Sequence, residues 1–218
     1  MRAVAPMVED KHGDHFLREH AAHTEHVRQR LGHYVTKGPA IKPIRPEYIA
    51  AVLSELADDD AVFTVDTGTP CIWAARHIEY GRDRRMFGSF TWASMGSASP
   101  KRLRRRAVLP QAAGHRPVRR RRLHHARARR PADPGPAQAR VVNVIFNNGM
   151  LDFVNLEQQE AGIIPFGTDF VNPDFSQVAK ALGGRGVRVE EPGDVRDALR
   201  AALAHTDGPV VVDAVVDR

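Results

Sequence analysis

Apolar residues along this chain recur with the two periods that distinguish strands from helices. Short apolar runs bounded by turn residues predict strands at residues 61–65, 141–146, 187–189 and 209–216. Helical spacing predicts helices at residues 1–35, 46–56 and 193–204, one opening at Pro70, and one from Pro173 or Asp174 to Leu182. Strands that alternate with helices predict an α/β fold, a doubly wound parallel sheet with helices on both faces.

A run of apolar, mostly β-branched residues stops abruptly at Asn147-Asn148-Gly149. Such a run fits a strand buried on both faces of a parallel sheet. Its carboxyl end is the place where open α/β sheets bind ligands. Asparagine side-chain oxygens suit Mg²⁺ beside a phosphate, although an Asn-Asn-Gly sequence taken alone is more often an ordinary turn.

The net charge of +6 comes from one window of the sequence. Between Ser97 and Arg140 there are 13 arginines and one lysine against a single acid, Asp133, so the window carries +13 and the rest of the chain −7. The window contains no Phe, Trp or Tyr on which nucleic-acid bases could stack. We therefore expect no nucleic-acid partner.

The single cysteine, Cys71, excludes an internal disulfide and suits a reducing compartment, so we expect a cytoplasmic location. It is either a reactive thiol or a small buried hydrophobic residue, and packing is favoured. His20, His23 and His26 recur at helical spacing, but no carboxylate or thiolate completes a convincing metal site, and a solvated connector helix is favoured.

Three blocks of the sequence resemble the cofactor-binding domain of thiamine-diphosphate enzymes, most closely the pyruvate dehydrogenase (quinone) and pyruvate oxidase branch. The blocks are DDAVFTVDTGTPCIWAARHI (59–78), RRMFGSFTWASMGSA (84–98) and VIFNNGMLDFVNLEQQEAG (144–162). A weaker block covers residues 173–199 and continues into GPVVVDAVV (208–216). The resemblance implies a thiamine-diphosphate-binding domain at residues 41–216, after a helical linker and remnant of a middle domain at residues 1–40.

The resemblance implies where this domain would hold its cofactor. Asn148 would bind Mg²⁺ through its side chain, and Met150 would bind it through the backbone carbonyl. Gly68 and Thr69 would lie against the diphosphate, at a helix N-terminus suited to anions. The plainer structural reading of these two residues is a turn in which Thr69 caps the helix that begins at Pro70.

Two further residues take a role from the resemblance. Met95 would support the bent form of thiamine diphosphate, and Phe153 would lie near the substrate pocket. Core packing is the plainer reading of both side chains.

The resemblance implies an enzyme that uses thiamine diphosphate and Mg²⁺ to decarboxylate pyruvate oxidatively to acetate. The cofactor supplies an electron sink, and the electrons would pass through FAD to a quinone. Such relatives are homotetramers, and some full-length members contact membranes peripherally. Acetolactate synthase, or another 2-oxo-acid decarboxylase of this fold, is the alternative enzyme. A basic, non-catalytic nucleic-acid-binding protein is the alternative from another class.

This chain departs from the family pattern in ways that predict no turnover by the chain alone. The domain with the activating glutamate has no counterpart in it, nor has most of the flavin-contacting domain, so we expect a truncated part without a catalytic residue. The family's Gly-Asp-Gly motif, whose aspartate binds Mg²⁺, should lie near Arg119, where the chain has four consecutive arginines. Arg120 replaces the aspartate, and a guanidinium offers no acceptor to a cation.

A shift of reading frame would explain this window. The codons GGC GAC GGC GGC TTC ACC ATG encode Gly-Asp-Gly-Gly-Phe-Thr-Met; read from a C one base earlier, they encode Arg-Arg-Arg-Arg-Leu-His-His, which is residues 119–125. We expect residues 97–140 to be an out-of-frame translation and to be disordered. A genuine disordered insertion is the alternative, although a loop of about 40 residues inside a compact domain is unusual.

Overall fold

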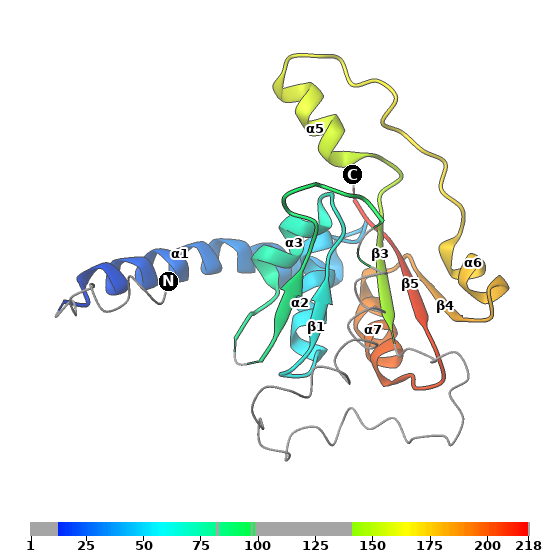
Figure 1. Cartoon of the computed structure of the whole chain (residues 1–218), viewed down its shortest axis with the longest axis horizontal. Coiled ribbons are helices and arrows are strands. Elements are labelled where there is room, and N and C mark those ends of the chain that lie inside the picture. Colours follow the sequence, from blue (N-terminus) through cyan, green and yellow to red (C-terminus); the bar gives the residue numbers. More distant parts are fainter. Residues whose placement is uncertain (1–12, 82, 97, 99–140, 218) are drawn as a thin grey trace.

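The computed structural model describes residues 13–81, 83–96, 98 and 141–217 (Figure 1). The expected frame-shifted window, at residues 97–140, therefore lies outside the described residues except for Ala98. The helices are α1 (His15–Lys37), α2 (Pro46–Leu56), α3 (Pro70–His77), α5 (Asp152–Glu160), α6 (Phe175–Ala181) and α7 (Val195–Ala204). The strands are β1 (Val62–Thr64), β2 (Arg85–Phe87), β3 (Val142–Asn147), β4 (Arg185–Val189) and β5 (Val210–Val215).

All strand pairs among these elements are parallel, as the sequence predicts. β1 pairs with β2, and β5 lies between β3 and β4 in a second sheet. The predicted burial of the strand before Asn147 on both faces is wrong for most of its length. β3 is partly buried except at Asn147, because α6 and α7 pack mainly on β4 and β5.

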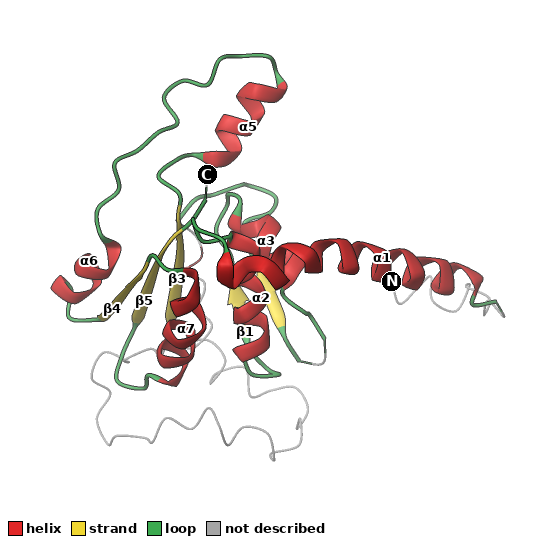
Figure 2. Ribbon diagram, turned by 180° about the vertical axis from the view of Figure 1, so that it is seen from behind, coloured by secondary structure: helices red, strands yellow, loops and turns green. Residues whose placement is uncertain are grey.

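The two faces of β5 meet different helices, because side chains alternate along a strand. Val210, Val212 and Ala214 join the main hydrophobic core, together with residues of α2 and α7. Asp213 lies on the other face, where its carboxylate accepts a hydrogen bond from the backbone N–H of Phe175, the first residue of α6. Helices thus cover both faces of this sheet, as predicted, and Figure 2 shows α7 and α2 on the near side of the strands.

Helix α6 can approach β4 closely because Gly186 has no side chain. A Cβ on Gly186 would lie 1.9 Å from the carbonyl oxygen of Ser176 in α6. The predicted start of this helix is confirmed, since the carboxylate of Asp174 accepts hydrogen bonds from the backbone N–H groups of Ser176 and Gln177. Its predicted end is confirmed as well, because Gly183 follows it with a φ of 80°.

Helix α2 connects the two sheets through its apolar face. Ile49 and Val52 are buried in the main core. Leu53 packs against that core and also against a second cluster, formed under β1 and α3 by Val65, Ala74 and Ile78. The predicted amphipathic helix at residues 46–56 is confirmed.

Helix α1 extends away from the rest of the molecule (Figure 1) and has no buried residue. Only its carboxyl-terminal end packs, where Val35 contacts the main core. This agrees with a solvated connector helix for the described part, residues 15–37. Among the described residues, no helix is long and apolar enough to cross a membrane.

Candidate functional site

The loops that follow β1 and β3 lie at the same edge of the molecule. In Figure 1 the helices after these loops, α3 and α5, both lie toward the upper end of the strands, as does the carboxyl end of the chain. Open α/β sheets bind ligands at the carboxyl ends of their strands. Gly68, Thr69, Asn148 and Met150 therefore belong to the edge at which the sequence predicts a cofactor site.

The two adjacent asparagines at the end of β3 have different roles. Asn147 is buried, and its Nδ2 donates to Oδ1 of Asp213 at 2.9 Å while its Oδ1 accepts from Nδ2 of Asn172 at 2.9 Å. Asn148 is partly exposed, and its Oδ1 accepts from the backbone N–H of Met150 at 3.1 Å. The Asn147 side chain thus bonds to other residues of the fold, whereas the Asn148 side-chain oxygen lies at the turn.

The backbone on either side of Met150 is fixed by two hydrogen bonds. The carbonyl of Gly149 accepts from the N–H of Phe170 at 2.7 Å, and the N–H of Leu151 donates to the carbonyl of Thr168 at 2.8 Å. Gly149 has a φ of 69°, which glycine adopts at little cost. This short pairing holds Met150 at the start of the excursion that contains α5.

The groups at this turn fit a bound Mg²⁺ ion that also contacts phosphate. The Asn148 amide oxygen and the Met150 carbonyl are hard oxygen ligands, and Mg²⁺ commonly takes only one or two protein groups besides phosphate and water. Within the described part of the chain, no group of three or more His, Cys, Asp and Glu residues could hold a metal ion.

The loop after β1 turns into α3 at Gly68, and the predicted N-cap position of Thr69 before Pro70 is confirmed. Thr69 occupies the N-cap position, yet its side chain makes no capping hydrogen bond. Its φ and ψ of −55° and −26° are already helical, whereas a capping side chain normally requires an extended N-cap residue. Gly68 has a φ of 139°, a conformation that favours glycine.

Asp66 ties this loop to the segment that carries Met95. One oxygen of its carboxylate accepts from the N–H of Thr67 at 3.1 Å, and the other accepts from the N–H of Gly96 at 2.7 Å. Met95, which directly precedes Gly96, has a side chain that is 70% exposed. Core packing is therefore wrong as a reading of Met95, and its role under the cofactor stays a prediction.

Phe153 and Cys71 are both partly buried. Phe153 lies in the first turn of α5, and its place near a substrate stays a prediction. The Cys71 thiol donates to the carbonyl of Asp66 at 2.8 Å and packs against the smaller hydrophobic cluster. Burial raises the pKa of this thiol, which favours a packing role over a reactive one.

The sequence reasoning missed Asp213, which is fully buried on β5. Its carboxylate accepts from Arg188 at 2.8 Å in addition to Asn147 and Phe175. The pKa of Arg188 is raised, first by its hydrogen bond to Glu190 and then by the charge of Asp213. A lone acidic residue in the apolar run VVVDAVV was the signal that could have revealed it.

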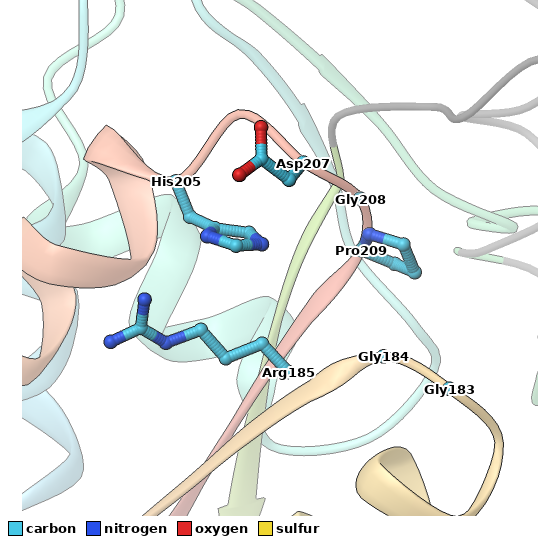
Figure 3. A pocket seen from close by; sticks show the side chains of 7 residues that line it. All are labelled: Gly183, Gly184, Arg185, His205, Asp207, Gly208 and Pro209. Atoms are coloured by element: carbon cyan, nitrogen blue, oxygen red, sulfur yellow. The ribbon is translucent and has the colours of Figure 1, made fainter.

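A hollow of about 250 Å³ lies at the opposite edge, beside the amino ends of β4 and β5 (Figure 3). Arg185, His205 and Asp207 line it together with backbone of neighbouring glycines. The backbone N–H of Arg185 is already bonded to the carbonyl of Pro209. Its place, away from the carboxyl ends of the strands, separates it from the candidate cofactor site.

Comparison with known proteins relates part of the chain to a cofactor-binding domain. Residues 137–214 match the thiamine pyrophosphate enzyme, C-terminal TPP-binding domain. The chain is 29% identical to YdaP of Bacillus subtilis, named as a thiamine pyrophosphate-containing protein, with 99% of this chain and 37% of the relative covered. It is 31% identical to an acetolactate synthase of Mycobacterium bovis, with 79% and 29% covered.

A pyruvate oxidase of Lactiplantibacillus plantarum is 24% identical, with 80% of this chain and 29% of that protein covered. The chain thus spans about a third of the length of these relatives. The residues that match the family model begin at residue 137 and include β3, α5, α6, β4 and α7. The chain is therefore related to the thiamine pyrophosphate enzymes through their C-terminal, cofactor-binding domain.

Proposed function

We propose that this chain binds the Mg²⁺–diphosphate unit of thiamine diphosphate at the carboxyl ends of β1 and β3. The observation that carries the proposal is the division between the two asparagines. The side chain of Asn147 is hydrogen-bonded to Asp213 and Asn172, whereas Asn148 lies at the turn with its Oδ1 beside the Met150 backbone. The match to a TPP-binding domain over the same residues supports it.

Each candidate residue then has a defined task. Asn148 and the carbonyl of Met150 would hold the metal ion, and Gly68 and Thr69 would border the diphosphate at the start of α3, where the helix dipole favours an anion. Met95, exposed on the loop anchored by Asp66, would support the cofactor. When bound, thiamine diphosphate supplies an electron sink for loss of CO₂ from a 2-oxo acid.

For the reaction of the whole protein, we propose oxidative decarboxylation of pyruvate to acetate, with electrons passing through FAD to a quinone in a homotetramer. Resemblance to the quinone-linked branch and the pyruvate oxidase relative support it. Acetolactate synthesis is the second candidate, because an acetolactate synthase relative reaches 31% identity. Dye reduction driven by pyruvate would identify the first activity, and acetolactate formation would identify the second.

We also propose that residues 97–140 are an out-of-frame translation, with Arg120 in place of the metal-binding aspartate, and that the chain as it stands has no turnover. The four consecutive arginines at residues 119–122, where the resemblance places a Gly-Asp-Gly motif, support this. Resequencing the gene tests it: arginine codons confirmed in frame would contradict the proposal. The single Cys71 fits a reducing compartment, so we propose a cytoplasmic location.

Thermal unfolding of the purified chain with thiamine diphosphate tests the cofactor proposal. We expect the melting temperature to rise with cofactor plus Mg²⁺ and to stay unchanged when EDTA removes the metal, because a ligand of the native state stabilises it. The Asn148→Ala variant should lose the response. Salt-sensitive retention on heparin without any response to the cofactor would instead favour a basic binding protein.

A further inference from the structure

The carboxylate of Asp213 lies where residues 148–174 leave the sheet and where they return to it. Its Oδ1 accepts from Nδ2 of Asn147, the last residue of β3, at 2.9 Å. Its Oδ2 accepts from the backbone N–H of Phe175, the first residue of α6, at 3.0 Å. One side chain on the central strand therefore holds both ends of an excursion that contains α5.

A third contact closes this arrangement. Nδ2 of Asn172, just before α6, donates to Oδ1 of Asn147 at 2.9 Å, so the departing and returning chain are also joined directly. Closer to the turn, Gly149 and Leu151 pair with Phe170 and Thr168. Asn148 thus lies between these two sets of hydrogen bonds, Met150 lies within the set nearer the turn, and Asp213 anchors the set nearer the sheet.

We infer that Asp213 is a positioning residue, which fixes the turn that presents Asn148 and Met150 for metal and diphosphate binding. The inference rests on the proposed function for its ligand. Its structural part rests on the contacts of Asp213 alone.

The chemistry of the position favours this role over simple packing. A buried carboxylate is costly unless its charge is paired and its oxygens accept hydrogen bonds. Asp213 is 0% exposed, and Arg188 supplies the charge at 2.8 Å. Val211 and Val215, on the same face of β5, are apolar, so this face does not itself require a charge. The role of the Asp213 carboxylate is to accept hydrogen bonds from Asn147 and Phe175.

The test compares Asp213→Val with Val211→Ala, a control on the same strand and face that removes packing but keeps the carboxylate. Hydrogen exchange followed by mass spectrometry should show at least about tenfold faster exchange at Leu151 and Phe170 in Asp213→Val, relative to amides of α7. The control should show no such local difference. A uniform increase over the whole molecule, or no increase at these amides, would overturn the inference.

A second variant and a ligand measurement complete the experiment. Asn172→Ala removes only the direct hydrogen bond between Asn172 and Asn147 and keeps the carboxylate, so it keeps the test available if Asp213→Val does not fold. It should accelerate exchange at the same amides. Mg²⁺-dependent stabilisation by thiamine diphosphate should be lost in Asp213→Val and kept in Val211→Ala; equal responses would overturn the positioning role. If the wild-type chain itself shows no response, the proposed function fails, while the exchange result still decides whether Asp213 fixes the turn.

Discussion

Nδ2 of Asn147 donates to Oδ1 of Asp213 at 2.9 Å, and this hydrogen bond distinguishes two asparagines that are adjacent in the sequence. Asn147 is the central member of a hydrogen-bonded network that also contains Asn172. Asn148, one residue further, has its oxygen at the turn, where a metal ion could reach it.

Substitution of the two asparagines should therefore have opposite effects. Asn147→Ala leaves a buried acceptor of Asp213 without its donor, so we expect the free energy of unfolding to fall by about 1–3 kcal/mol. Asn148→Ala should change stability little and abolish Mg²⁺-dependent stabilisation by thiamine diphosphate. Urea unfolding with and without cofactor measures both effects. Equal loss of stability in the two variants would contradict the division of roles.

The main core depends on Leu199 of α7, which is 1% exposed. Leu199→Ala removes a buried side chain and leaves a cavity, so it should lower the free energy of unfolding by about 2–5 kcal/mol. Leu182→Ala is the matched control, because Leu182 is 83% exposed. Chemical denaturation should separate the two variants clearly, and a similar small effect in both would show that α7 does not pack as described.

Gly186→Ala tests the close packing of α6 on β4. The added methyl group would meet the carbonyl of Ser176 at 1.9 Å, so the helix must move, at a cost of about 1–3 kcal/mol. Gly193→Ala is the control, since a Cβ there meets nothing within 4 Å. Thermal unfolding should show a lower melting temperature only for the first variant. Two unchanged melting temperatures would argue against this contact.

His77 should make stability depend on pH. Burial lowers the pKa of His77, more than nearby Glu47 raises it, and its Nε2 is buried without a hydrogen-bond partner among the described residues. The folded state thus favours the neutral ring, so stability is full above the ordinary value near 6.5 and is lost as pH falls through it toward the folded pKa.

The free energy of unfolding between about pH 7.5 and about pH 5.5 measures this effect. His77→Gln should lose less stability over this range than the wild-type chain. His26→Gln, an exposed change on α1, should behave like the wild type. A steeper pH dependence in His77→Gln than in the wild-type chain would contradict the assignment.

Local pattern predicted the elements whose apolar face or terminal signal is contained in a short stretch of sequence. The face of α2 with Ile49 and Val52 is one example, and the cap at Asp174 is another. Strand β2 was not predicted, because three residues pairing with β1 carry no visible period.

The role of Asp213 escaped prediction because its partners are remote in sequence. Asn147 is 66 residues away, and Arg188 is 25 residues away. No local pattern brings these side chains together; only the order of strands in the sheet does. The division between Asn147 and Asn148 follows from the same network. The residue pattern pointed only to the turn, and the family resemblance singled out Asn148.

Calorimetric titration of thiamine diphosphate into the purified chain tests the central claim most directly. With Mg²⁺ present we predict a saturable heat of binding at one site, which disappears when EDTA replaces the metal and in the Asn148→Ala variant. Absence of binding under all conditions, or binding that is the same with and without Mg²⁺, would contradict a metal-bridged cofactor site at the end of β3.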